Sequence, residues 1–102
     1  MKPCEIHVGK AFVLGKHQVQ AGWKVAPSDG LDLPELTAKA RNTSDKASAM
    51  FVTIKFLRGD EVVMNISCTT DQLEPGQVQA ANCFGGEKFT KKYDRITAEA
   101  TF

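Results

Sequence analysis

The chain has 102 residues, of which 42% are apolar and 25% are charged, and its formal net charge is +1. This length suits one domain, and the balance is that of a globular protein rather than a disordered or membrane-embedded one. The basic residues are scattered, so the concentrated positive face that nucleic-acid binding requires is missing. We therefore expect a single domain over residues 1–102, with residues 1–4 as a disordered terminus and no nucleic-acid partner.

The sequence contains no apolar run that approaches the roughly 20 residues needed to span a bilayer. The opening residues, MKPCEIHVGK, also lack the apolar stretch of a signal peptide. Two interpretations follow: the protein is cytoplasmic, or the sequence is a trimmed mature form with a new Met1. The choice between them depends on the chemistry of the cysteines.

Along most of the chain, apolar residues alternate with polar ones, with the period of two that is typical of half-buried β-strands. In chain order, we expect strands at residues 5–14, 19–25, 36–42, 50–58, 61–68, 78–83 and 96–102. Turn residues separate these runs, and no convincing amphipathic helix interrupts them. The pattern predicts an all-β protein, an antiparallel two-sheet sandwich of about seven strands.

The apolar faces of these runs predict the core. The residues expected to be buried are Trp23, Val52, Ile54, Phe56, Ile66, Ala98 and Ala100. The run 61–68 presents one apolar face, formed by Val62, Met64, Ile66 and Cys68. On the opposite face of the run 50–58 lie Phe51 and Leu57. They are either covered by the N-terminal strands or form an exposed apolar patch that marks a partner surface.

Several short segments predict turns or irregularities. A bulge is expected at Gly9, where the alternation changes parity, and Pro75-Gly76 suits the centre of a type II turn. Arg58-Gly59-Asp60 matches an integrin-binding tripeptide, but Gly-Asp is ordinary chemistry for a hairpin turn, which we favour. Asn42 and Asn65 begin glycosylation-type tripeptides, and we interpret Asn42 as a residue that nucleates its turn through its side chain.

Cys68 and Cys83 offer a choice between metal binding, catalysis and a disulfide. No cysteine or histidine pair has zinc-ligand spacing, no Cys-x-x-Cys redox motif is present, and no third group is visible for a Cys–His nucleophile. We favour a disulfide, since the Pro75-Gly76 turn can bring the two strands together; the alternative is two reduced core cysteines. This pairing requires a bulge or twist near Ala81 that turns Cys83 inward, and it predicts an oxidising compartment.

Cys4 is then the unpaired cysteine. Its position near the start suits the lipid-bearing cysteine of a bacterial lipoprotein, although the preceding residues do not form a lipobox. The alternative is a free terminal thiol.

Three segments resemble the bacterial FxLYD-type domains: AKARNTSDKASAMFVTIKFLRGDEVV, LEPGQVQAANC and YDRITAEATF. The resemblance covers roughly residues 36–102, and the motif Phe-x-Leu-Tyr-Asp aligns with residues 54–58. Ile54 and Phe56 match the two apolar positions in kind, while Leu57 and Arg58 replace Tyr and Asp. This resemblance implies an immunoglobulin-like sandwich and a non-enzymatic role outside the cytoplasm, in secreted proteins and lipoproteins.

We therefore expect a monomeric, non-catalytic protein-interaction or structural module at the cell envelope or outside the cell. It would have a protein partner, no cofactor or metal, and membrane contact only through a lipid on Cys4. The alternative is a secreted effector, inhibitor or antigen that uses an edge strand or loop such as Lys24–Leu36 against a host or competitor protein. A hydrolase or thiol enzyme is disfavoured because no nucleophile–base pair is visible.

Overall fold

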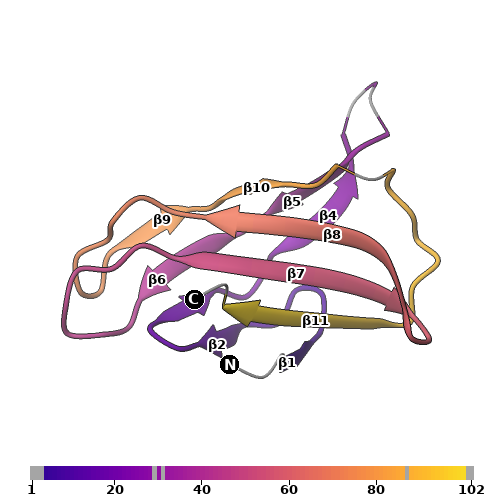
Figure 1. Ribbon diagram of the computed structural model, residues 1–102. Helices are drawn as coiled ribbons and strands as arrows, with labels where there is room; N and C mark the ends of the chain where they lie inside the picture. Colours follow the sequence, from indigo (N-terminus) through magenta and orange to yellow (C-terminus); the bar gives the residue numbers. More distant parts are fainter. Residues whose placement is uncertain (1–3, 29, 31, 87, 101–102) are drawn as a thin grey trace.

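The computed structural model describes residues 4–28, 30, 32–86 and 88–100, and these residues form β-strands and loops without any helix. The strands, shown in Figure 1, are β1 Cys4–Ile6, β2 Phe12–Leu14, β3 His17–Val19, β4 Lys24–Pro27, β5 Pro34–Thr37, β6 Lys39–Asn42, β7 Phe51–Arg58, β8 Glu61–Thr69, β9 Val78–Ala80, β10 Asn82–Phe84 and β11 Arg95–Ala100. The expected all-β class is confirmed.

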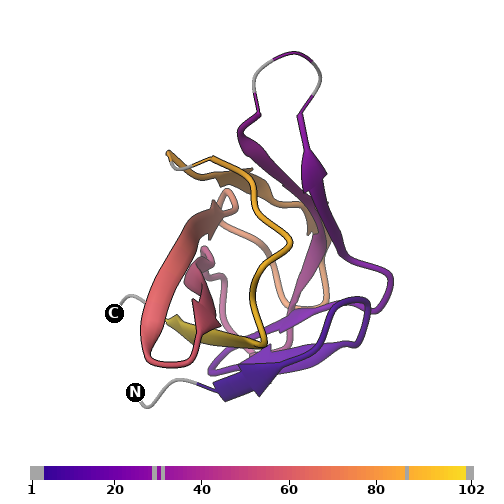
Figure 2. The same ribbon diagram turned by 90° about the vertical axis from the view of Figure 1, so that its right-hand side faces the viewer.

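All strand pairs among the described residues are antiparallel, and they belong to three sheets. The largest sheet has the order β1-β11-β7-β8-β10, the second has the order β2-β3-β6-β9, and β4 and β5 form a separate two-stranded sheet. The strands of the five-stranded and four-stranded sheets enclose one core (Figures 1 and 2). The β4–β5 hairpin extends beyond both sheets in the two views.

Six of the seven residues predicted to be buried are in the core: Trp23, Val52, Ile54, Phe56, Ile66 and Ala98. Trp23 also donates its indole N–H to the Lys10 carbonyl at 2.8 Å, which satisfies its one polar atom. The prediction is wrong for Ala100, which is only half-buried. Ala100 ends β11 and lines a cavity there, so no packed side chain covers it fully.

Four of the seven expected runs are each divided into two strands, so the described residues contain eleven strands. The run 5–14 is broken by a turn at Val8-Gly9, where Gly9 has φ +83°, rather than bulged as expected. Its first half, β1, pairs with β11, and its second half, β2, pairs with β3 in the other sheet. A sharp turn with φ > 0 lets one apolar run contribute to both sheets.

The same change of sheet occurs at Ala81. β9 pairs with β6 in the four-stranded sheet, whereas β10 pairs with β8 in the five-stranded sheet. Ala81 lies between these strands, and its N–H donates to the Ala38 carbonyl at 2.9 Å. The irregularity predicted near Ala81 is therefore present as a crossing between sheets, and this crossing brings Cys83 opposite Cys68.

Val62 does not face the core, contrary to the alternation of the run 61–68; it is 44% exposed. The pairing of β7 and β8 shifts register between Phe56, which pairs with Met64, and Leu57, which pairs with Val62. Val63 is therefore an extra residue in β8, and a bulge of this kind reverses the facing of the residues beyond it. Met64, Ile66 and Cys68, on the other side of the bulge, are buried as predicted.

Asn42 and the Pro75-Gly76 turn hold one end of the domain together. Gly76 has φ +81°, and the Gln77 N–H donates to the Glu74 carbonyl at 2.9 Å, which confirms a type II turn. The fully buried Asn42 amide donates to the carbonyls of Lys46 and Leu73 at 2.7 and 2.8 Å.

The Asn42 side chain also accepts two hydrogen bonds. Its Oδ1 accepts from the Ser44 N–H at 2.9 Å and from the Ser44 hydroxyl at 2.7 Å. Both amide hydrogens and both acceptor sites of Asn42 are thus occupied. The predicted role of Asn42 in nucleating its turn is confirmed, and its buried amide is not accessible for glycosylation in the folded protein.

Candidate functional site: surfaces, disulfide and cavity

The disulfide predicted between Cys68 and Cys83 is present in the structure. The two residues pair directly across β8 and β10, with their Cα atoms 4.1 Å apart. Cys68 is buried and Cys83 is half-buried and packs against the core. The bond therefore attaches the three-residue edge strand β10 to the long β8, which is a structural role. A disulfide is consistent with an oxidising compartment.

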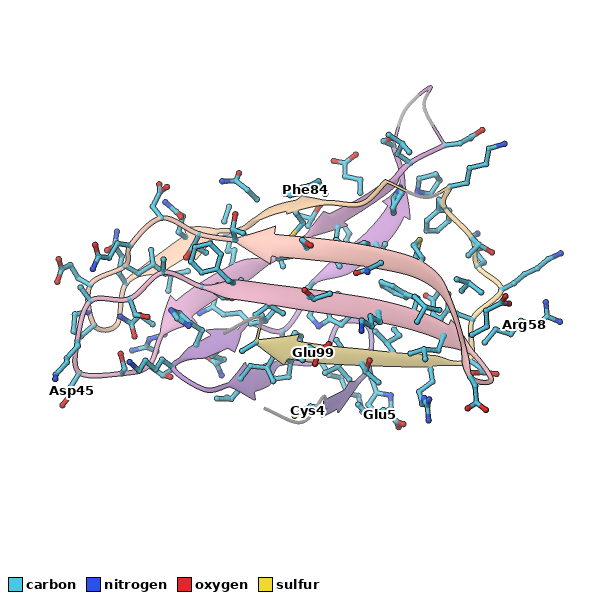
Figure 3. All side chains as sticks on the ribbon, in the orientation of Figure 1. Cys4, Glu5, Asp45, Arg58, Phe84 and Glu99 are labelled. Atoms are coloured by element: carbon cyan, nitrogen blue, oxygen red, sulfur yellow. A yellow bond between two sulfur atoms is a disulfide. The ribbon has the colours of Figure 1, made fainter. Side chains whose placement is uncertain are left out.

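Cys4 is a free, exposed cysteine and takes no part in this bond. It was expected in a disordered terminus, but it begins β1 and pairs with Ala98; residues 1–3 lie outside the described residues. β1 and β10 are the two edge strands of the five-stranded sheet, so Cys4 and Phe84 lie at its opposite edges (Figure 3). Lipidation of Cys4 stays a prediction.

Phe51 and Leu57, the predicted partner surface, are not brought into one patch. Phe51 is 40% exposed and Leu57 is half-buried. They lie at opposite ends of β7 and are six residues apart, a separation of about 20 Å at roughly 3.3 Å per residue. Phe84, which is 66% exposed on β10, is not among the residues predicted from the sequence to form a partner surface. Its outward direction follows from the inward direction of its neighbour Cys83, since successive strand residues face opposite ways.

The Arg58-Gly59-Asp60 segment is an exposed turn at one end of the molecule, and Arg58 extends from that end in Figure 3. Gly59 has φ +61°, as the first central residue of a type II′ hairpin turn requires. The Gly59 N–H points to the Asp94 carboxylate, with N–O distances of 3.2 and 3.4 Å. The hairpin turn expected here is present, and its geometry accounts for Gly59.

The β4–β5 hairpin carries two prolines, Pro27 and Pro34, which pair with each other. The Ser28 N–H donates to the Leu33 carbonyl at 2.8 Å, so Ser28 and Leu33 are a hydrogen-bonded pair. In an antiparallel ladder, hydrogen-bonded pairs alternate with pairs that are not hydrogen-bonded. The pair Pro27–Pro34 is therefore an unbonded one, so the hairpin loses no ladder bond. The free edge of β4 does lose a donor at Pro27, which opposes the addition of another strand.

The exposed side of this hairpin is formed by two cross-strand pairs. Lys24 pairs with Thr37 and Ala26 pairs with Glu35, and all four residues are exposed. The opposite side packs on the core through the buried Leu36 and the half-buried Val25. We refer to Lys24, Ala26, Glu35 and Thr37 as the hairpin face.

A cavity of about 250 Å³ lies where three distant segments meet: residues 14–17, residues 48–52 and Ala100. Its apolar lining includes Leu14, Met50, Val52 and Ala100. Its polar lining is formed by Lys16, which is exposed, His17, which is buried, and Ser48, which is half-buried. This cavity could not be predicted from the sequence, because only the chain crossings place these segments together.

Within residues 4–28, 30, 32–86 and 88–100, no three His, Cys, Asp or Glu side chains gather as a metal site would require. The same residues contain no helix that is long and apolar enough to cross a membrane. Comparison of the chain with protein-family models, curated proteins and solved structures finds no match.

Proposed function

We propose that the protein is a monomeric, non-catalytic protein-interaction module that works outside the cytoplasm and contacts its partner through the hairpin face. The projection of the β4–β5 hairpin beyond the two larger sheets carries this proposal (Figures 1 and 2). A projecting element can reach a partner without any change in the core, and binding residues commonly occupy such positions on a rigid scaffold.

Recognition at this site relies on side chains rather than on strand addition. Pro27 removes the donor that an added strand would need at the free edge of β4. The hairpin face presents a cation at Lys24, an anion at Glu35 and small side chains at Ala26 and Thr37. A partner surface of complementary charge could dock on it closely, because Ala26 adds little bulk beside Glu35.

The Cys68–Cys83 bond supports a site of action outside the cytoplasm, because disulfides persist in oxidising compartments. We further propose that the fold is an immunoglobulin-like sandwich related to the FxLYD-type domains. The support is the motif segment on β7, where Ile54 and Phe56 occupy buried positions. A lipid on the exposed Cys4 would hold such a module at the membrane surface.

Photo-crosslinking in the cells that produce the protein tests the contact surface. A photoreactive residue would replace Glu35 on the hairpin face, Phe84 on the competing exposed edge, or Asp45 at a remote exposed loop. We expect one partner protein to be captured from position 35 and not from positions 84 or 45. Capture from position 84 alone would show that the partner contacts β10 and would contradict the proposed role of the hairpin face.

The second candidate function is that of a secreted effector, inhibitor or antigen, which would use the same hairpin. The observation that favours it is again the projecting hairpin, since an inhibitor needs an element that enters a target. The location of the crosslinked partner distinguishes the two: a component of the producer's own envelope supports the module, and a host or competitor protein supports the effector.

A further inference from the structure

The cavity beside Ala100 has the composition of a small binding site rather than of a packing defect in the core. Met50 and Val52 are almost fully buried behind the lining, Phe51 is 40% exposed, and Lys16 is exposed. The cavity is therefore apolar at depth and cationic where it meets solvent. None of its described lining residues is acidic, so the charge of Lys16 is not neutralised within the cavity.

Two further polar groups contribute to this cavity. The His17 ring places Nε2 3.3 Å from the Ser48 carbonyl oxygen. A carbonyl accepts only, so in this hydrogen bond Nε2 carries the proton. The His17 ring is thereby held in one orientation, and Ser48, also in the lining, brings a hydroxyl that can donate to an anion.

We propose that this cavity binds a small apolar carboxylate, with the carboxylate beside Lys16 and the hydrocarbon part against Phe51, Ala49 and Ala100, the apolar lining residues that retain accessible surface. The carboxylate would remain partly solvated at the exposed end, which avoids the cost of burying a charge completely. The hydrocarbon part would gain from leaving water, because this section of the lining is apolar. A cationic ligand is opposed by Lys16, since none of the described lining residues carries a carboxylate that would offset the repulsion.

The size of the cavity limits the ligand. A volume of about 250 Å³ corresponds to about eight water molecules at roughly 30 Å³ each, and therefore to a ligand of about eight non-hydrogen atoms. A branched acid such as 4-methylpentanoate has this size. The side chain and carboxylate of an apolar C-terminal residue have the same chemistry and about the same size, and the rest of the peptide would lie outside the cavity. The source is therefore either a free acid or the C-terminus of a protein.

Titration followed by ¹H–¹⁵N NMR tests the proposal with two matched ligand pairs. The first pair is 4-methylpentanoate and the neutral 4-methylpentanamide, and the second is N-acetyl-leucine and its amide. We expect the acids to shift the amide signals of Gly15, Ser48, Ala49 and Ala100 with a millimolar Kd, as befits so small a ligand. The amides should bind at least fivefold more weakly. Stronger binding of N-acetyl-leucine would indicate a peptide terminus, and stronger binding of 4-methylpentanoate a free acid.

Variants of Lys16 examine the proposed charge contact. Lys16→Glu should raise the Kd of the acid at least tenfold, whereas Lys16→Arg should keep it within about threefold because the charge remains. Lys39→Glu is the matched control: Lys39 is an exposed strand lysine that does not line the cavity, so its variant should bind as the unaltered protein does. Equal binding of acid and amide, shifts confined to other residues, or the absence of binding would each overturn the proposal.

Discussion

Cys83 lies directly opposite Cys68, with a Cα–Cα distance of 4.1 Å, and the bond between them attaches the edge strand β10 to β8. The sequence separation of 15 residues corresponds to a stabilisation of about 3 kcal/mol in the chain-entropy model. Replacement of both cysteines by alanine should therefore lower the Tm by roughly 10 °C or more, at about 4 to 8 °C per kcal/mol.

Differential scanning calorimetry measures this change, and Cys4→Ala is the matched control because Cys4 is exposed and unpaired. Mass spectrometry of the unreduced digest should also show a peptide crosslinked through Cys68 and Cys83. Free alkylation of both thiols in the oxidised, folded protein would contradict the bond and remove the main physical support for a site of action outside the cytoplasm.

Ile54→Ala should lower the free energy of unfolding by about 2 to 5 kcal/mol, because the residue is 1% exposed between the two larger sheets. Thr53→Ala, at the neighbouring position on the outer face of β7, should change it by less than about 1 kcal/mol. Urea denaturation of both variants provides the comparison. Similar small effects at the two positions would show that the inner face of β7 is not packed.

The Asn42 side chain forms four hydrogen bonds, three within the turn that follows β6 and one to the distant Leu73 carbonyl. Each hydrogen bond contributes about 0.5 to 1.5 kcal/mol, so Asn42→Ala should lower the free energy of unfolding by at least about 2 kcal/mol. Asn82→Ala is the control. Because Asn82 is exposed on β10, its replacement should change the free energy of unfolding by no more than about 0.5 kcal/mol. If chemical denaturation gives equal stability for the two variants, the Asn42 network does not stabilise the fold.

Gly85 follows the edge strand β10 and is closely approached by its neighbours. A Cβ atom there would lie 2.7 Å from the Asn65 carbonyl oxygen and 3.0 Å from Pro34 Cγ. Gly85→Ala should therefore destabilise the protein by about 1 to 3 kcal/mol through overpacking. At Gly86 a Cβ would meet no atom within 4 Å, so Gly86→Ala should leave the Tm within about 3 °C of the unaltered value. An equally small shift for Gly85→Ala would refute the close approach.

Local patterns in the sequence were sufficient to predict features that depend on neighbouring residues. The type II turn at Pro75-Gly76 and the turn at Asn42 are determined by backbone and side-chain chemistry within a few residues. Burial of Ile54 and Phe56 follows from strand alternation. The disulfide followed from the cysteine positions together with the turn between them.

Features that depend on distant pairing could not be predicted from such patterns. The run 5–14 reads as one strand, and only pairing with β11 and β3 shows that it divides between two sheets at Gly9. Val62 points to solvent rather than into the core as predicted, because β8 contains one residue, Val63, that has no partner in β7. The cavity beside Ala100 depends on three segments that are remote in sequence, so its lining emerges only from the fold.

The central claim is that the hairpin face contacts a partner protein, and the partner's affinity for two alanine-to-arginine variants tests it most directly. Ala26→Arg adds bulk and charge to the hairpin face beside Glu35, whereas Ala80→Arg makes the same change at the exposed end of β9. Calorimetric titration with the crosslinked partner should show that Ala26→Arg weakens binding at least tenfold, about 1.4 kcal/mol, while Ala80→Arg leaves the affinity unchanged. Unchanged affinity for a correctly folded Ala26→Arg variant would contradict the claim.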